Sequence, residues 1–563
     1  MSRLADLPRR RFLTGAAALS VAGLLPGWAR SAAGEASPQA LSGERIDLTI
    51  GHAPLRIDGR KGHAIAINGA VPGPLIRLKE GRNVRIAVTN TLYEDTSIHW
   101  HGVLTPSHMD GVPGLSFPGI KPGQTFVYEF PVIQAGTYWY HSHSGVQEQM
   151  GHYAPMIIDP AGPEPAPYDR EHVIVLSDHS FLHPHEIIAR LKRQAGYFNR
   201  RRQTLAGLSA GKDQPLGERL EWSRMRMDPT DILDVTGSTY TYLVNGHGPQ
   251  SNWTGLFSPG ERVRLRFVNA AAMTIFNLRI PGLPMTVVQA DGQDIRPVET
   301  DELQISNAET FDVIVHPTAD RAYTIVAEAA DSSGMARATL APRPGMTAQV
   351  PPLRRRPLLT MRDMGMDMSG HGGHAMDMSM RNPKNAPGVK LGPGVQAIAP
   401  MPVDRTGDRG TGLADAPHRV LVYADLEALK PNPDAQPPTR TIDLHLTGNM
   451  ERFMWSFDGV AYSEGAQPIA LRRDERVRVN LINDTMMNHP IHLHGHFVEL
   501  VNGKPADRQP RKHTVNVMPG ARLAFDLTAN APGDWAFHCH MLLHMHAGMF
   551  RVVTVRPLDG EAA

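Results

Sequence analysis

Near its C-terminus the chain reads Trp535-Ala-Phe-His-Cys-His-Met-Leu-Leu-His-Met-His-Ala-Gly-Met549. Cys539 is the only cysteine in 563 residues, so it has no partner for an intrachain disulfide. A thiolate, imidazoles and a weak axial methionine form the ligand set of electron-transfer blue-copper sites. In an extended strand, Cys539 faces one side while His538 and His540 face the other. One strand could therefore serve two metal centres; the alternative is a buried free cysteine among incidental histidines.

The chain contains a threefold internal repeat of domain size. The copies begin at Ile67-Asn-Gly, Val244-Asn-Gly and Phe457-Asp-Gly. Each leads into a segment with alternating apolar and polar residues, and these segments are 81–90, 260–269 and 474–483. The alternation predicts strands with one buried face. With 52 glycines, 47 prolines and little helical periodicity, the composition favours an all-β chain.

Paired histidines occur in the outer two copies of the repeat only. The four pairs are His99/His101, His141/His143, His492/His494 and His538/His540. The middle copy has Phe276-Asn-Leu278 and Val326-Ala-Glu328 at the corresponding places. On a strand, residues i and i+2 share a face, so each pair presents two imidazoles to one place. Eight imidazoles exceed the needs of one ion, so the pattern predicts several metal ions held by the outer domains.

The repeat predicts three β domains, at residues 43–160, 168–342 and 418–557. Residues 343–417 form a methionine-rich connection, and residues 185–230 are interpreted as a partly helical insertion in the middle domain. The net charge of +1 favours neither nucleic acid nor an anionic membrane surface as a partner.

Residues 1–34 have the layout of an export signal. Arg9-Arg10-Arg11-Phe12-Leu13 precedes an apolar run at 14–25 and small residues at 29–33. The consecutive arginines resemble a twin-arginine signal, and the apolar run is too short to span a bilayer as a stable helix. The alternative is a disordered basic N-terminus. No other segment is long and apolar enough to enter a membrane, so the mature protein is expected to be soluble in the periplasm.

The motifs His-x-His-Gly, His-x-His, His-Pro-x-His-x-His-Gly and His-Cys-His-x3-His-x4-Met together resemble those of the multicopper oxidases. The resemblance covers essentially the whole mature chain. It implies three cupredoxin-like Greek-key β-sandwich domains, four copper ions, and oxidation of a reductant coupled to reduction of dioxygen to water. A copper-storage protein without turnover is an alternative, but storage does not need a complete type-1 site. A copper nitrite reductase is disfavoured by the third domain and the full set of pairs.

The resemblance also implies which residues bind each copper, by motif position. The type-1 ligands would be His489, Cys539, His544 and Met549. The type-2 ligands would be His99 and His492. One type-3 copper would take His101, His141 and His540, and the other His143, His494 and His538. Electrons would pass from the type-1 copper through Cys539, a catalytic residue in this sense, to its flanking histidines.

Protons must also reach the dioxygen site, and a nearby carboxylate is the natural donor. Asp110, nine residues after His101, is the candidate, although Asp-Gly is also an ordinary turn. Some relatives carry an acidic residue after the counterpart of His544, whereas this chain has Met545 and His546. A second relay there is therefore in doubt. Three further histidines are expected to be structural or exposed: His152, His247 and His496.

Residues 361–380 contain seven methionines and two histidines. Thioethers suit Cu(I), so the tract predicts accessory cuprous binding by Met361, Met364, Met366, Met368, His371, His374, Met376, Met378 and Met380. The alternative is a flexible linker that binds nothing.

The methionine tract, the twin-arginine start and the surroundings Ser142, Gly145, Gln147, Gln149 and Met150 are similar to those of periplasmic copper-resistance oxidases, the copper-resistance protein A type. That similarity implies oxidation of Cu(I), and of phenols as in laccases. A laccase with a phenolic physiological substrate would share every copper ligand and stays an alternative. Expected partners are dioxygen, Cu(I) or phenolic reductants, and other periplasmic copper-handling proteins.

Overall fold

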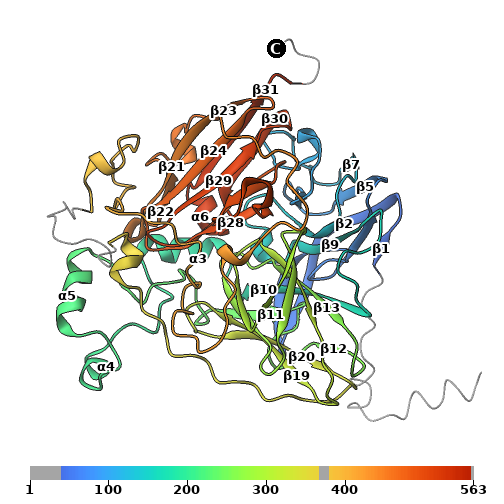
Figure 1. Ribbon diagram of the computed structural model, residues 1–563, viewed down its shortest axis with the longest axis horizontal. Coiled ribbons are helices and arrows are strands. Elements are labelled where there is room, and N and C mark those ends of the chain that lie inside the picture. Colours follow the sequence, from blue (N-terminus) through green and yellow to red (C-terminus); the bar gives the residue numbers. More distant parts are fainter. Residues whose placement is uncertain (1–39, 367–379, 559–563) are drawn as a thin grey trace, which may run out of the picture.

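The computed structural model describes residues 40–366 and 380–558. These residues form six β-sheets that pack in pairs as three cupredoxin-like sandwiches, coloured blue, green and orange-red along the chain in Figure 1. The predicted all-β class with three domains is confirmed. The expected export signal at 1–34 lies outside the described residues. Among the residues described, no helix is long and apolar enough to cross a membrane.

The first sandwich pairs a five-stranded with a four-stranded sheet. The five strands are, in order, β1 (Leu41–Ser42), β4 (Ile76–Lys79), β9 (Tyr153–Asp159), β8 (Gly136–His141) and β6 (His99–His101). The four strands are β3 (Arg60–Ile67), β2 (Arg45–Ile57), β5 (Asn83–Asn90) and β7 (Thr125–Pro131).

The middle sandwich pairs a six-stranded with a five-stranded sheet. The six strands are β11 (Tyr240–Val244), β10 (Arg170–Ser180), β13 (Val263–Asn269), β18 (Thr310–Val315), β15 (Met285–Ala290) and β16 (Gln293–Thr300). The five strands are β12 (Thr254–Leu256), β20 (Met335–Ala341), β19 (Tyr323–Ala329), β14 (Phe276–Arg279) and β17 (Glu302–Ile305).

The third sandwich repeats the layout of the middle one. Its six strands are β22 (Met454–Phe457), β21 (Arg440–Asn449), β24 (Arg476–Asn483), β29 (Arg522–Thr528), β26 (Val498–Val501) and β27 (Arg511–Lys512). Its five strands are β23 (Ile469–Arg472), β31 (Phe550–Arg556), β30 (Gly533–Cys539), β25 (His489–Leu493) and β28 (Thr514–Val517).

The sequence repeat corresponds to one pairing pattern used three times. The repeat strands β5, β13 and β24 each pair in parallel with an earlier strand and antiparallel with a later one. Each copy begins with a tight turn at Asn68-Gly69, Asn245-Gly246 or Asp458-Gly459, where all six residues have positive φ. Type I′ hairpin turns require this conformation at both central positions, which explains the recurring Asn/Asp-Gly pair.

The prediction of one buried face holds for β5 and is wrong for β13 and β24. In β5 buried and more exposed residues alternate, whereas every residue of β13 is buried. The polar face of β13 is covered because Arg264 and Arg266 both pair with the buried carboxylate of Asp312, at 2.7 and 2.8 Å. Thr137 of the first domain also donates to Asp312, at 2.9 Å. A polar face can therefore be buried when another domain supplies its partners.

Short α-helices occupy two connections between neighbouring strands of the same sheet, one after β10 and one after β30. They are α3 (Pro184–Arg193), α4 (Leu205–Ser209), α5 (Leu216–Arg224) and α6 (Leu542–His546). The first three fall in the predicted insertion of the middle domain. Helix α3 buries Ile187, Ile188 and Leu191 and contacts the 3₁₀-helix η6 (Met450–Arg452) of the third domain. The insertion thus bridges the middle and third sandwiches.

The Asp312 network generates a stability prediction. Asp312→Asn removes the charge shared by two buried guanidinium groups, and breaking such a buried pair is expected to lower the free energy of unfolding by about 3 kcal/mol. Thermal and denaturant unfolding of the copper-loaded protein measure the change. The matched control is Asp320→Asn, because Asp320 pairs with Arg343 at 2.7 Å where both side chains are exposed. Its expected cost is about 0–1 kcal/mol, and equal costs for the two variants would contradict the prediction.

Candidate metal centres

The paired histidines lie on equivalent strand pairs of the first and third sandwiches. In the first, His99 of β6 pairs with His141 of β8. In the third, His492 of β25 pairs with His538 of β30. The corresponding strands of the middle sandwich, β14 and β19, place Asn277 opposite Glu328. Of the three equivalent strand pairs, those of the first and third sandwiches therefore carry imidazoles.

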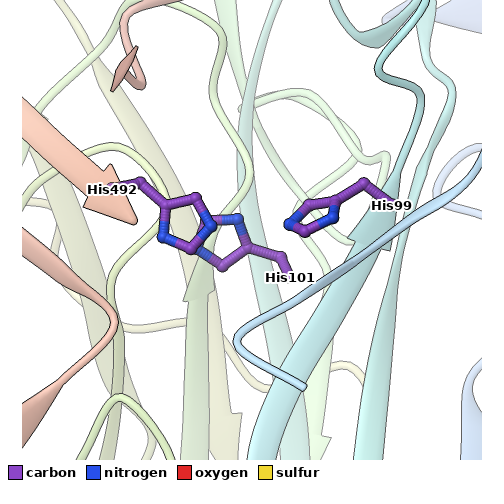
Figure 2. A group of neighbouring side chains, drawn as sticks. All are labelled: His99, His101 and His492. Atoms are coloured by element: carbon purple, nitrogen blue, oxygen red, sulfur yellow. The ribbon is translucent and has the colours of Figure 1, made fainter. Parts of the chain in front are cut away.

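All eight paired histidines converge between the first and third sandwiches. Their ligand atoms form three groups within 4.8 Å: His99, His101 and His492; His101, His141 and His540; His143, His494 and His538. Figure 2 shows the first group, with His492 reaching from a strand of the third domain toward two histidines of the first. The rings of His101 and His492 stack at 3.8 Å. Each domain supplies half of the cluster.

Hydrogen bonds at Nδ1 orient several of these rings. His99 donates to the Asp110 carbonyl at 2.9 Å, and His492 donates to the His513 carbonyl at 2.6 Å. His141 donates to Glu148 at 2.8 Å. The unprotonated Nε2 atoms of these three rings then point into the cluster, as outer hydrogen bonds arrange in metal-binding histidines.

Several cluster nitrogens are buried and have no hydrogen-bond partner among the described residues. They are Nε2 of His99, His141 and His492, Nδ1 of His101 and both nitrogens of His540. A buried polar atom without a hydrogen bond destabilises the folded protein. The presence of six such nitrogens in one place therefore requires an explanation. Nitrogen lone pairs aimed at a common space fit bound metal ions, and imidazole suits copper.

The surroundings lower the pKa of several cluster histidines. Burial, followed by repulsion from neighbouring imidazoles, lowers the pKa of His492 and His494 well below its usual value. Burial lowers the pKa of His538 to about 4. Only a neutral imidazole can bind a metal, so the environment keeps these ligands ready at neutral pH.

Cys539 has its own group of partners on the other face of β30. Its Sγ lies 3.6 Å from His489 Nδ1 and 3.7 Å from His544 Nδ1. Met549 is fully buried, and its carbonyl accepts a hydrogen bond from the Cys539 amide at 3.2 Å. Burial raises the pKa of the Cys539 thiol, so a thiolate here requires a bound cation. The predicted opposition of Cys539 and its two neighbouring histidines is present.

Asp234 and Trp455 hold His544 in place, and the sequence motifs pointed to neither. His544 Nε2 donates to Asp234 Oδ2 at 2.7 Å, which leaves Nδ1 free to face Cys539. Trp455 stacks on the His544 ring at 4.0 Å. Asp234 belongs to the middle domain, outside any motif, so only the folded arrangement identifies it. Burial raises its pKa to about 7.

Sequence reasoning also missed Glu148 and His513. Glu148 lies between Gln147 and Gln149, and no motif points to it. His513 is buried, and its Nδ1 lies 3.1 Å from His101 Nε2. Neither residue has a counterpart in the repeat register that would have marked it.

Asp110 lies between the two halves of the cluster. One carboxylate oxygen accepts from His494 Nδ1 at 2.8 Å, and the other lies 3.2 Å from His99 Nδ1. The carboxylate is buried. This residue from the first domain therefore orients one histidine of each outer domain.

The three additional histidines lie outside these groups. Burial lowers the pKa of His152 to about 3 and that of His496 to about 4. His247 is half-buried in a turn. None belongs to a group of metal-binding side chains within the part of the chain that the structure describes.

The described ends of the methionine tract are packed against the protein. Met361–Met364 forms the 3₁₀-helix η3, in which Met364 is buried, while Met361, Met366 and Met380 are half-buried against the core. The other predicted accessory ligands lie outside the described residues: Met368, His371, His374, Met376 and Met378.

A hollow of about 540 Å³ lies where the insertion meets the third domain. Three methionines and three acidic residues are among those that line it: Met227, Met450, Met486, Asp228, Asp231 and Glu451. Asp231 Oδ1 is buried and has no hydrogen-bond partner among the residues that the structure describes. Burial, followed by the charge of Asp234, raises the pKa of Asp231. Asp231 thus connects the hollow to the carboxylate that holds His544.

Comparisons with known proteins agree with this geometry. Family models described as multicopper oxidase match residues 49–163, 215–345 and 435–559. The chain is 48% identical to a copper resistance protein A homolog of Pseudomonas syringae pv. tomato, and 46% identical to copper resistance protein A of Escherichia coli. Each of these two comparisons covers 97% of this chain and 99% of the relative.

Solved structures of multicopper oxidases share the fold. The crystal structure of the multicopper oxidase Fet3p matches with a TM-score of 0.65 at 21% identity, over 92% of this chain and 91% of that one. The clusters around Cys539 and the paired histidines are consistent with type-1, type-2 and type-3 copper sites. By its sequence along nearly its whole length, the chain belongs to the multicopper oxidase family.

Proposed function

We propose that the protein oxidises Cu(I) in the periplasm, with dioxygen as the electron acceptor, and thereby serves copper resistance. The names of the relatives from Pseudomonas syringae and Escherichia coli support the role in resistance. The observation that carries the choice of Cu(I) is the hollow with three methionines, since thioether sulfur is a soft ligand that favours cuprous copper.

The hollow is connected to the Cys539 site through two carboxylates. Asp231 lines it, Asp234 neighbours Asp231, and Asp234 accepts the 2.7 Å hydrogen bond from His544. A cuprous ion held by thioethers and carboxylates there would be one side chain away from a type-1 ligand. The carboxylates would also stabilise the Cu(II) product, because oxygen ligands are harder than sulfur.

The proposed ligand sets follow the observed groups. His489, Cys539, His544 and Met549 would hold the type-1 copper, and His99 with His492 the type-2 copper. The remaining six cluster histidines would hold the type-3 pair. These ions would supply one-electron acceptance at the Cys539 site and four-electron transfer to dioxygen at the cluster.

The chain's own groups supply connection, orientation and protons. The β30 backbone joins Cys539 directly to His538 and His540, so both centres are covalently linked. Asp234 fixes the tautomer of His544, and Asp110 fixes His494. Asp110 is also our candidate proton source for dioxygen reduction, because its carboxylate lies inside the cluster.

The ligand proposal predicts a separation of two effects. Cys539→Ser should abolish the intense visible absorption and all oxidase turnover, because only this residue supplies a thiolate. The matched variant His540→Ala should keep that absorption and lose dioxygen reduction, because His540 faces the cluster. Absorption spectra and oxygen uptake measure both. Strong visible absorption in the serine variant, or normal reoxidation by air of the reduced alanine variant, would refute the assignment.

The hollow predicts a substrate-specific loss. Met227→Leu combined with Met450→Leu keeps side-chain volume but removes two soft donors, so KM for Cu(I) should rise about tenfold, equivalent to about 1.4 kcal/mol of binding. Turnover of a bulky phenol should be unchanged. Met335→Leu, at a half-buried methionine outside the hollow, is the control. Equal effects on both reductants, or none, would favour a laccase acting on phenols.

The methionine tract predicts a loss of cuprous capture. Deletion of residues 367–379 should lower kcat/KM for Cu(I) and the number of Cu(I) ions bound beyond four, because a tethered chelator raises the local concentration of substrate. A shuffled tract of the same composition is the control and should retain most activity. Unchanged cuprous binding and kinetics after deletion would reduce the segment to a linker.

A further inference from the structure

Five exposed histidines form a strip across all three domains, outside the centres described above. We call His52, His63, His183, His185 and His546 the histidine strip. His52 and His63 lie on β2 and β3, His183 and His185 at the start of α3, and His546 at the end of α6. Neighbouring rings have centroids 4.7 Å apart for His52 and His63, 5.2 Å for His183 and His185, and 6.1 Å for His185 and His546.

Two pairs in the strip have unused ring nitrogens. The side chains of His52, His63, His185 and His546 make no hydrogen bond or ion pair with residues 40–366 and 380–558. His183 differs, because its Nδ1 accepts from the His185 amide at 3.3 Å and so caps α3. That bond places the His183 proton on Nε2, which removes this ring as a ligand and fixes the position of His185 in the first turn.

The geometry of the two pairs suits a shared metal ion. His52 and His63 are diagonal neighbours on the paired strands β2 and β3, with His52 opposite Ile65 and His63 opposite Pro54, and the pairing fixes the backbone of both. His185 and His546 meet across the boundary between the middle and third domains, where α3 and α6 lie close together in Figure 1. Metal–nitrogen bonds of about 2 Å require nitrogens about 3–4 Å apart. All four side chains are exposed, and the proposal requires their rings to rotate until the nitrogens of each pair reach that spacing.

The donor chemistry favours divalent copper over cuprous copper. Both pairs offer imidazole only, and among first-row divalent ions Cu(II) binds nitrogen ligands most tightly. The hollow differs, because methionine thioethers are among its lining groups. We propose that the histidine strip contains two surface sites for Cu(II), His52/His63 and His185/His546, which retain the divalent ion outside the four-copper set. The proposal rests on the proposed function only for the source of that ion, the product of cuprous oxidation.

The test counts Cu(II) bound by the full-length enzyme already loaded with four coppers. Equilibrium dialysis against Cu(II) with metal analysis, and electron paramagnetic resonance of the added ions, should show two sites with nitrogen ligands. His52→Ala/His63→Ala and His185→Ala/His546→Ala should each remove one ion, so each double variant is the control for the other. His108→Ala and His316→Ala remove single exposed histidines that have no neighbouring ring, and they should change nothing.

Three results would overturn the proposal: no added Cu(II) with nitrogen ligands, unchanged binding in both double variants, or equal losses in the variants at His108 and His316. The last result would mean that any exposed histidine binds the ion. Binding is measured with no turnover, so a failure of the cuprous-oxidase proposal leaves this count unaffected. Phenol oxidation by His185→Ala should equal that of the unmodified enzyme, since this side chain is exposed and belongs to none of the groups around Cys539 or the paired histidines.

Discussion

The pairing register of β25 with β30 is the constraint on which both metal centres depend. Ile491 lies opposite Cys539, and His492 lies opposite His538. A slip of one residue would turn Cys539 toward the histidine cluster and expose the cluster ligands to the wrong face. Core packing opposes such a slip. Trp535 on the same strand is buried, and its indole N–H donates to the Ala531 carbonyl at 2.9 Å. The hydrophobic residues of β30 therefore fix the positions of its ligands.

Without bound metal, the histidine cluster lowers the stability of the folded protein. Eight imidazoles, seven of them fully buried, lie close together with several nitrogens unpartnered. Burial and mutual repulsion lower the pKa of several of them, which avoids charge but leaves lone pairs unsatisfied among the described residues. Because each outer domain supplies four of the eight, ions bound there would also join the two domains. The free energy of metal binding would therefore also stabilise the docking of the two domains, as expected when a site does not exist in the unfolded chain.

The sequence predicted what the repeat and the motifs encode, and no more. The three β domains follow from the internal repeat, and the opposition of Cys539 to its neighbours follows from strand periodicity. The sandwich fold and the sharing of the His-x-His pairs between the outer domains follow from the resemblance to multicopper oxidases. Asp234 and His513 could not be found that way, because each meets its histidine only through contacts between elements distant in the sequence. Glu148 lies close to His141 in the sequence, but no motif or repeat position marks it. The prediction that β13 has only one buried face is wrong for a related reason. Whether a polar face is exposed depends on what packs over it, and here Asp312 and Thr137 cover the arginines.

The middle domain has no metal-binding pairs, yet it controls the environment of the Cys539 centre. Its Ala272 carbonyl accepts from the Leu542 amide at 2.9 Å, and the Met273 sulfur accepts from the Leu543 amide at 3.3 Å. These two bonds hold the first turn of α6, the helix that carries His544. Asp234 of the same domain then fixes the His544 ring. The middle sandwich, which supplies no member of the Cys539 group, is therefore required for the geometry of that group. Its insertion also forms one wall of the methionine-lined hollow, so the middle domain contributes both to the surroundings of Cys539 and to the site that we propose for the cuprous substrate.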